Sequence, residues 1–255
     1  MALRISISFF VFLLGACWGS FLNCLVYRWE QGKRINSGRS FCPKCRHQLG
    51  FWDLIPVASF VFLKRKCRYC GGKISWQYFL AETATGGLFL ASYILFHNDF
   101  TFLVFSWPVI ILLVIIFIYD LKHYIIPDRV IYSAIGIVFF YRLFAGHEPF
   151  FGFLWAALAA AGFFFCIWAV SRGRWMAFGD VKLAFFMGLF LGLPGVILAL
   201  FAAFLSGAAT GVILLALGRK KMQSQVPFGP FLVAGTFIGL FWGDKIIRWY
   251  LNLSG

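Results

Sequence analysis

Four of the seven cysteines form two closely spaced pairs, a pattern typical of metal-binding sites. The pairs are Cys42-Pro-Lys-Cys45 and Cys67-Arg-Tyr-Cys70, with 21 residues between them. Four thiolates at this spacing can enclose Zn²⁺ in a tetrahedron, and Gly71 and Gly72 permit the tight turn that such knuckles use. Zinc held by four cysteines has no open coordination position, so its role would be structural. Two disulfide bonds are the alternative.

Two aspartates, Asp120 and Asp180, adjoin apolar runs and could act together in catalysis. Asp120 follows Val109–Tyr119, and Asp180 follows Gly179 at the start of another apolar segment. Ionisable groups in membrane segments are costly, so they indicate functional sites. Two carboxyl groups held close share one proton: the ionised one activates water, and the protonated one polarises a peptide carbonyl. This predicts aspartic protease chemistry without a catalytic metal, and Gly179 would let substrate or the partner aspartate approach the backbone.

Structural roles are open for the same acids. Asp120 could pair with Lys122 at the membrane interface, and Asp180 could stabilise the start of a helix. Asp128 follows a proline, so we expect it in the first turn of a helix, outside the catalytic pair. Glu82 is expected one turn inside an apolar run, where it could pair with a loop arginine or line a polar pocket.

The composition explains what must position these groups. Of 255 residues, 62% are hydrophobic and only 13% are charged, whereas soluble domains carry about 25% charged residues. A membrane-spanning helix needs about 20 mainly apolar residues. The sequence therefore predicts an all-α, polytopic membrane protein with about eight spans, and the break at 192–195 leaves open whether the sixth and seventh are separate. The predicted spans are Ile5–Tyr27, Tyr78–Phe96, Phe102–Tyr119, Val130–Phe144, Phe151–Val170, Val181–Leu193, Gly195–Leu217 and Phe228–Ile247.

The net charge of +14 follows from the predicted topology. Basic residues concentrate in cytoplasmic loops of membrane proteins. If the basic loop 28–77 is cytoplasmic, all but four of the 23 Lys and Arg residues lie on that side; the exceptions are Arg4, Arg142, Lys245 and Arg248. Nucleic acid is therefore not needed to explain the charge. The cysteines then lie in a reducing compartment, which favours a zinc-ribbon-like loop over disulfides, and both aspartates lie at cytoplasmic helix ends.

These motifs together resemble the bacterial type IV prepilin peptidases, which are aspartyl proteases with a GxGD motif. Gly179-Asp180-Val-Lys182-Leu resembles that motif, although Ala177 replaces its first glycine, and Asp120 with Ile126-Pro127-Asp128 resembles the first catalytic motif. The N-terminal part also resembles the family in four places: Gly19-Ser20-Phe21-Leu22-Asn23, both cysteine pairs, Asp53-x-Ile55-Pro56, and Tyr78 up to Glu82. Leu54 is a departure, because the family often has asparagine at this position.

The resemblance implies a specific activity and division of the chain. The family cuts basic leaders from prepilins and pseudopilins at the cytoplasmic face of the bacterial inner membrane, here with Asp120 and Asp180 as catalytic residues supported by Gly179 and Lys182. Many members then methylate the new N-terminus with S-adenosylmethionine, and Glu82 is our candidate for that reaction. We expect a methyltransferase part at 1–100 and a six-helix peptidase domain at 101–255, with the basic loop contacting membrane lipids.

Two other functions are considered. One is a peptidase of the same family without methyltransferase activity. The other is a proton-coupled transporter or assembly subunit. The predicted position of both aspartates, at helix ends, argues against this function, because transporter sites lie near the bilayer midplane.

Overall fold

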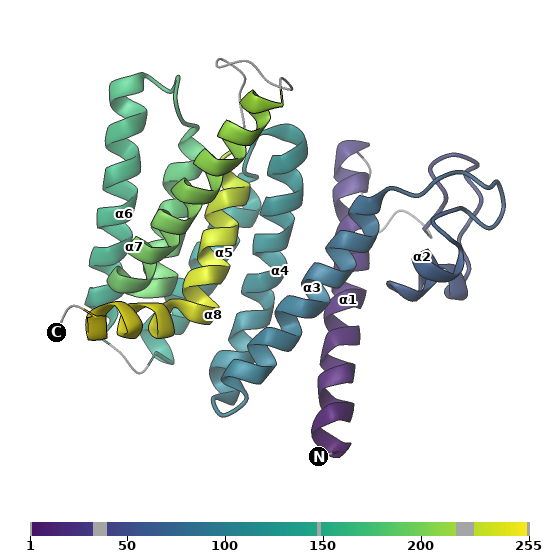
Figure 1. Ribbon diagram of the computed structural model, residues 1–255, viewed down its shortest axis with the longest axis horizontal. Coiled ribbons are helices and arrows are strands. Elements are labelled where there is room, and N and C mark those ends of the chain that lie inside the picture. Colours follow the sequence, from purple (N-terminus) through teal and green to yellow (C-terminus); the bar gives the residue numbers. More distant parts are fainter. Residues whose placement is uncertain (1, 33–39, 147–148, 218–226, 254–255) are drawn as a thin grey trace. The chain divides into compact units, whose positions relative to one another are not determined.

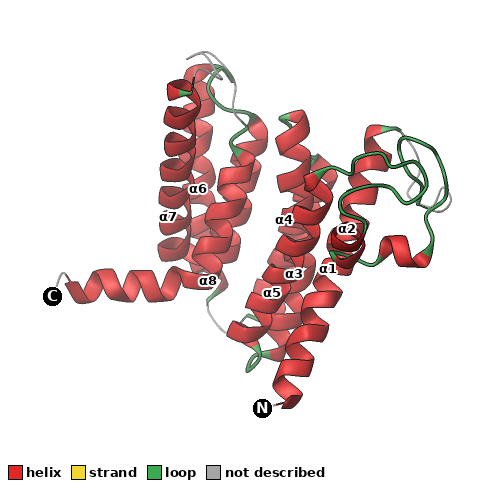
Figure 2. Cartoon of the chain, turned by 45° about the vertical axis from the view of Figure 1, so that its right-hand side comes forward, coloured by secondary structure: helices red, strands yellow, loops and turns green. Residues whose placement is uncertain are grey.

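The computed structural model describes residues 2–32, 40–146, 149–217 and 227–253, and most of these residues are helical, with a long loop region between α1 and α3 (Figures 1 and 2). In this part of the chain, β-structure is limited to two isolated bridges. The prediction of an all-α fold is therefore confirmed. The elements are α1 (Ala2–Glu30), η1 (Phe51–Leu54), α2 (Ala58–Phe62), α3 (Trp76–Phe96), α4 (Phe100–His123), α5 (Asp128–Phe144), α6 (Phe150–Ser171), α7 (Phe178–Ala216) and α8 (Gly229–Leu253).

Among the described residues, six helices are long and apolar enough to cross a membrane, namely α1, α3, α4, α6, α7 and α8. The predicted fourth span corresponds to α5, which has 17 residues. The predicted basic segments at 33–39, with Lys33, Arg34 and Arg39, and at 218–226, with Arg219, Lys220 and Lys221, lie outside the described residues.

Helix α7 consists of two halves that reverse direction at Gly192. The backbone there is non-helical, with φ +73° and ψ 177°, and Pro194 follows. Phe178 in the first half packs on Trp168 of α6, while Phe204 in the second half packs on Phe164, so both halves run along α6 (Figure 1). The predicted sixth and seventh spans are therefore separate helices joined by a tight turn.

Contacts divide the chain into two units, Met1–Ile115 and Ile116–Gly255. In the first unit, α1 and α3 pack closely because small residues lie where they cross. A Cβ on Gly15 or Gly19 would lie within 2.8 Å of atoms of α3, and one on Gly86 would meet Phe12 of α1. Such spacing of small residues lets membrane helices approach with their backbones in contact.

The second unit is built around α7, which packs on α5, α6 and α8. Glycines again set the approach, because a Cβ on Gly188 would meet α6 and one on Gly235 would meet α7 at Ala199. Near the turn in α7, Arg142 of α5 donates a hydrogen bond of 2.6 Å to the Phe190 carbonyl. At its other end, the first half of α7 carries Asp180, beside the contact of Phe178 with α6.

Candidate active site and metal centre

Three helix ends of the second unit converge around Asp120. This residue lies in the last turn of α4, Asp180 lies in the first turn of α7, and Gly229 begins α8. Asp120 and Asp180 are only 4% and 5% exposed, and they lie within electrostatic range of each other. The two carboxyl groups that the sequence singled out are thus buried and brought together by α4 and α7.

Gly229 holds Asp120 by direct backbone contact. Its N–H donates a hydrogen bond to the Asp120 carboxylate. A Cβ built on Gly229 would lie 2.5 Å from Oδ2 of Asp120, which is closer than real Cβ contacts. Only glycine therefore fits here without moving the carboxylate.

Asp180 uses one carboxylate oxygen to begin α7. Its Oδ2 accepts a hydrogen bond of 3.3 Å from the Ala177 N–H, which is one of the unpaired donors at the helix start. The helix-start role therefore coexists with a position beside Asp120. Ala177 has φ −79°, an extended conformation that alanine adopts without strain, so the replacement of glycine is compatible with this backbone.

Gly179 and Lys182 connect α7 to the segment that follows α4. The atoms nearest to a Cβ on Gly179 belong to the Ile126 side chain, at 3.1 Å, so this glycine allows α7 to pack on the Ile126-Pro127 turn. Lys182 forms an ion pair of 2.6 Å with Asp128, the first residue of α5. The predicted helix-start position of Asp128 is confirmed, and its carboxylate contacts lysine.

Glu82 is buried in the first unit and bonds to backbone. It is 7% exposed, and its Oε2 accepts a hydrogen bond of 2.7 Å from the Val57 N–H, with a further bond to the Ser20 side chain. Within the described ranges no ion pair of Glu82 with an arginine is formed. Val57 has φ +64°, which is strained for a β-branched residue, so Glu82 stabilises an unfavourable turn before α2.

The four predicted metal ligands lie together. The Sγ atoms of Cys42, Cys45, Cys67 and Cys70 are all within 4.8 Å of one another, and the Cys42–Cys70 distance is 4.0 Å. Sulfur atoms about 2.3 Å from a central Zn²⁺ would lie about 3.8 Å apart in a tetrahedron. All four are free thiols in the structure. The donor set and its dimensions therefore fit a zinc ion.

The two cysteine pairs adopt the same knuckle geometry. In the first knuckle (residues 41–48), the Cys42 N–H donates to the His47 carbonyl and the Arg46 N–H donates to the Cys42 carbonyl. In the second knuckle (residues 66–73), Cys67 and Gly71 repeat these bonds. Arg46 and Gly71 occupy the equivalent left-handed position, at φ +59° and +66°. The glycine that the sequence suggested for the turn thus has a non-glycine counterpart in the first knuckle.

The thiols of the cluster differ in acidity. Burial raises the pKa of Cys42, but hydrogen bonds from the Cys45 and Lys44 backbones and from the Cys67 and Cys45 thiols together outweigh it and lower this pKa to about 7. At Cys70 a backbone hydrogen bond from Gly72 lowers the pKa, while desolvation and the other three thiols raise it to about 11. A dication at the centre would favour the thiolate form of all four.

Asp53 joins the second knuckle to η1. Its carboxylate contacts Arg68 at 3.0 Å, accepts a hydrogen bond of 3.2 Å from Tyr69, and accepts one of 3.1 Å from the Gly50 N–H. The Tyr69 ring in turn stacks on His47 of the first knuckle, with ring centroids 3.7 Å apart. The residues inside the second cysteine pair therefore carry contacts that hold this region together.

Comparison with known proteins identifies the family. A model described as "Bacterial Peptidase A24 N-terminal domain" matches residues 13–96, and one described as "Type IV leader peptidase family" matches residues 107–212. The chain is 33% identical over 247 residues to the "Prepilin leader peptidase/N-methyltransferase" of Bacillus subtilis, across 96% of this chain and 98% of that protein. The protein of the same name from Pseudomonas aeruginosa is 30% identical over 275 residues, across 95% and 93%.

The chain belongs to the type IV leader peptidase family. The leader peptidase match includes Asp120 and Asp180, and the N-terminal match includes the four cysteines and Glu82. No solved structure shows significant similarity to the chain.

The sequence did not predict one contact in the candidate active site of this leader peptidase family member, the contact between Gly229 and Asp120. Gly229 lies outside both family matches, in the segment Pro227-Phe228-Gly229-Pro230. Closely spaced proline and glycine indicate a turn, and that signal was present. It does not reveal which carboxylate the turn will meet.

Proposed function

We propose that this chain is a membrane aspartyl endopeptidase that removes the basic leader of type IV prepilins or pseudopilins at the cytoplasmic face of the bacterial inner membrane. We further propose that it then methylates the new N-terminus with S-adenosylmethionine. The observation that supports peptidase chemistry is the pair of buried carboxyl groups, Asp120 and Asp180, that α4 and α7 bring together. Membership of the leader peptidase family supports the substrate class.

In the proposed reaction, Asp120 and Asp180 share one proton. The ionised carboxylate takes a proton from water as the water oxygen attacks the scissile carbonyl carbon, and the protonated carboxyl donates a hydrogen bond to the carbonyl oxygen. The amide C–N bond then breaks as the nitrogen receives a proton, which leaves a free α-amine on the mature pilin. The Gly229 N–H and the Ala177 N–H each bond to one aspartate, which fixes both carboxyl groups in position.

Methylation is assigned to the N-terminal part, at 1–100, and peptidase activity to 101–255. The names of the relatives include N-methyltransferase, which supports the second activity. S-Adenosylmethionine would supply a methyl group to the deprotonated α-amine: the N–C bond forms as the C–S bond breaks, the sulfonium becomes a thioether, and the product amine loses a proton to water. The cysteine cluster would hold a structural zinc ion that orders the basic loop 28–77.

The decisive test compares three acid-to-amide variants. Asp120→Asn and Asp180→Asn should each leave no detectable cleaved product when co-expressed with a prepilin, while Asp128→Asn should cleave it. Asp128 is the matched control because it is a nearby aspartate, at the start of α5, whose carboxylate contacts Lys182. The readout is the mobility shift of the pilin, with membrane levels of each variant compared by immunoblot. An inactive Asp128→Asn together with an active Asp120→Asn would overturn the assignment.

Mass spectrometry of the processed N-terminus tests the second activity. A methylated terminus supports the bifunctional enzyme. An unmethylated terminus from the wild-type protein supports a peptidase without methyltransferase activity.

A further inference from the structure

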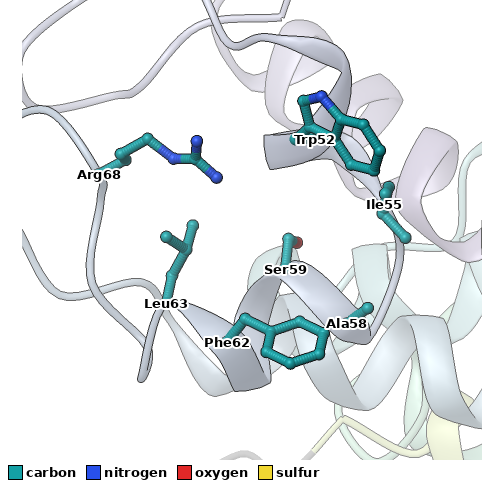
Figure 3. Close-up of a pocket in the computed structure, with 7 residues that line it drawn as sticks. All are labelled: Trp52, Ile55, Ala58, Ser59, Phe62, Leu63 and Arg68. Carbon is teal, nitrogen blue, oxygen red and sulfur yellow. The ribbon is translucent and has the colours of Figure 1, made fainter.

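A hollow lies on the cysteine-bearing loop, between η1, α2 and the second knuckle (Figure 3). Its volume of about 390 Å³ falls within the range of about 300–1,000 Å³ that is usual for small-molecule sites. Its walls are mainly apolar and aromatic with few polar groups, which is also usual for such sites. The lining includes Trp52, Ile55, Ser59, Phe62, Leu63 and Arg68.

Two polar groups point into this hollow from different elements. Figure 3 shows the guanidinium of Arg68, from the second knuckle, and the hydroxyl of Ser59, from α2, directed into the same space. Arg68 contacts Asp53 through Nε, at 3.0 Å, which leaves the terminal nitrogens of its guanidinium facing the hollow. A guanidinium presented in this way suits a carboxylate, which it can bind through two hydrogen bonds.

Buried carboxylates fix both walls of the hollow. Asp53 is only 5% exposed in its side chain and joins Arg68 and Tyr69 of the second knuckle to the start of η1. Glu82 bonds the Val57 N–H directly before α2, and so holds the helix that carries Ser59. The strained backbone at Val57 persists because this bond supports it, and such strain is concentrated at functional sites.

The aromatic wall is formed by Trp52. Its side chain is 70% exposed and adjoins the hollow, whereas the neighbouring Phe51 is 76% exposed and does not line it. An exposed indole face beside a pocket is suited to stacking with a flat heteroaromatic base, which is worth about 1–3 kcal/mol in base–aromatic contacts.

We propose that this hollow binds the methyl donor S-adenosylmethionine. Its adenine would stack on Trp52, its carboxylate would bond to Arg68, and its ribose hydroxyls would reach Ser59. The inference rests on the proposed methyltransferase function and assigns that function a binding site. Glu82 is then a positioning residue for the site, since it acts through Val57 and α2, and the zinc knuckles position Arg68.

The test is equilibrium binding of radiolabelled S-adenosylmethionine to the full-length, zinc-loaded protein in detergent micelles. Trp52→Ala should weaken binding about 5- to 150-fold, which is the loss of one stacking contact. Phe51→Ala is the comparison variant: its ring contacts the Trp52 ring edge-on but does not line the hollow, so this change should weaken binding less than Trp52→Ala does. Ser59→Leu, which fills the hollow from the opposite side, should also weaken binding. Zinc content and the thermal unfolding midpoint show whether each variant is folded.

A measurement on the wild-type protein keeps the inference testable if a variant does not fold. S-Adenosylhomocysteine should slow amide hydrogen exchange across residues 51–63, and no protection there would overturn the assignment.

The other outcomes separate this inference from the function on which it rests. Normal binding by both Trp52→Ala and Ser59→Leu, or equal weakening by Phe51→Ala, would show that the donor binds elsewhere while the methyltransferase function stands. If Ser59→Leu loses binding of short-chain phosphatidylglycerol but keeps its affinity for the methyl donor, we would conclude that the hollow is a lipid site. A wild-type protein that neither binds the donor nor methylates cleaved pilin would overturn both proposals.

Discussion

A single methyl group at Gly229 should disable the peptidase. In Gly229→Ala, the new Cβ would lie 2.5 Å from Oδ2 of Asp120, and ordinary van der Waals contact begins at 3.4 Å. The carboxylate must therefore retreat by about 0.9 Å, or α8 must shift by as much. Displacement of a catalytic group by about 1 Å can reduce the rate about 100-fold, which corresponds to about 2.7 kcal/mol in the activation barrier.

The matched control is Gly243→Ala in the same helix. A Cβ at Gly243 meets nothing within 4 Å, so that variant should cleave at the wild-type rate. Alanine is favoured over glycine in helices by about 1 kcal/mol, so loss of activity in Gly229→Ala cannot come from weaker helix formation. Both variants also keep the backbone N–H that bonds to Asp120.

The assay is cleavage of a purified prepilin by each variant in reconstituted membranes, with kcat/KM taken from initial rates. Gly229→Ala should retain about 1% of wild-type kcat/KM. Equal rates for the two glycine variants would refute the reasoning, because Asp120 would then not need its present position for cleavage.

Other predictions concern the groups around the dyad and the loop. Asp128→Asn, which breaks an ion pair whose carboxylate is largely exposed, should lower the free energy of unfolding by about 1 kcal/mol or less. It should keep peptidase activity within a few-fold, because Asp128 contacts Lys182 of α7 and is outside the proposed catalytic pair; chemical denaturation and initial rates measure both effects. Metal analysis should find about one zinc per chain. Cys42→Ser should lower the zinc content, and it should reduce methylation more than it reduces cleavage. A full zinc content in that variant would contradict the four-cysteine site. Glu82→Ala should reduce methylation of the product more than Glu82→Gln does, because glutamine keeps an oxygen that can accept the hydrogen bond from the Val57 N–H. Mass spectrometry of the product measures this difference. Equal loss of methylation in both variants would indicate that the carboxylate itself takes part in methyl transfer. Val57→Gly should partly restore methylation in Glu82→Ala, because glycine adopts a positive φ without strain.

The sequence by itself determined the fold class and the chemical groups. Apolar run lengths predicted the membrane helices, because the bilayer thickness fixes how many residues a span needs. The spacing of Cys42, Cys45, Cys67 and Cys70 predicted a four-sulfur cluster, because two knuckles can close a tetrahedron only at short internal separations. Asp120 and Asp180 were singled out by the cost of placing carboxylates at membrane helix ends. Their catalytic role stays a prediction.

The tertiary structure decided which groups touch. Gly229 and Asp120 are far apart in the chain, and nothing in the pattern of either segment specifies that α8 begins against the end of α4. The close neighbour of Gly179 is the Ile126 side chain, and the acceptor for the strained Val57 N–H is Glu82. Periodicity and spacing describe one segment at a time, whereas these contacts depend on how glycines let helices approach and on which buried carboxylate reaches an unpaired backbone donor.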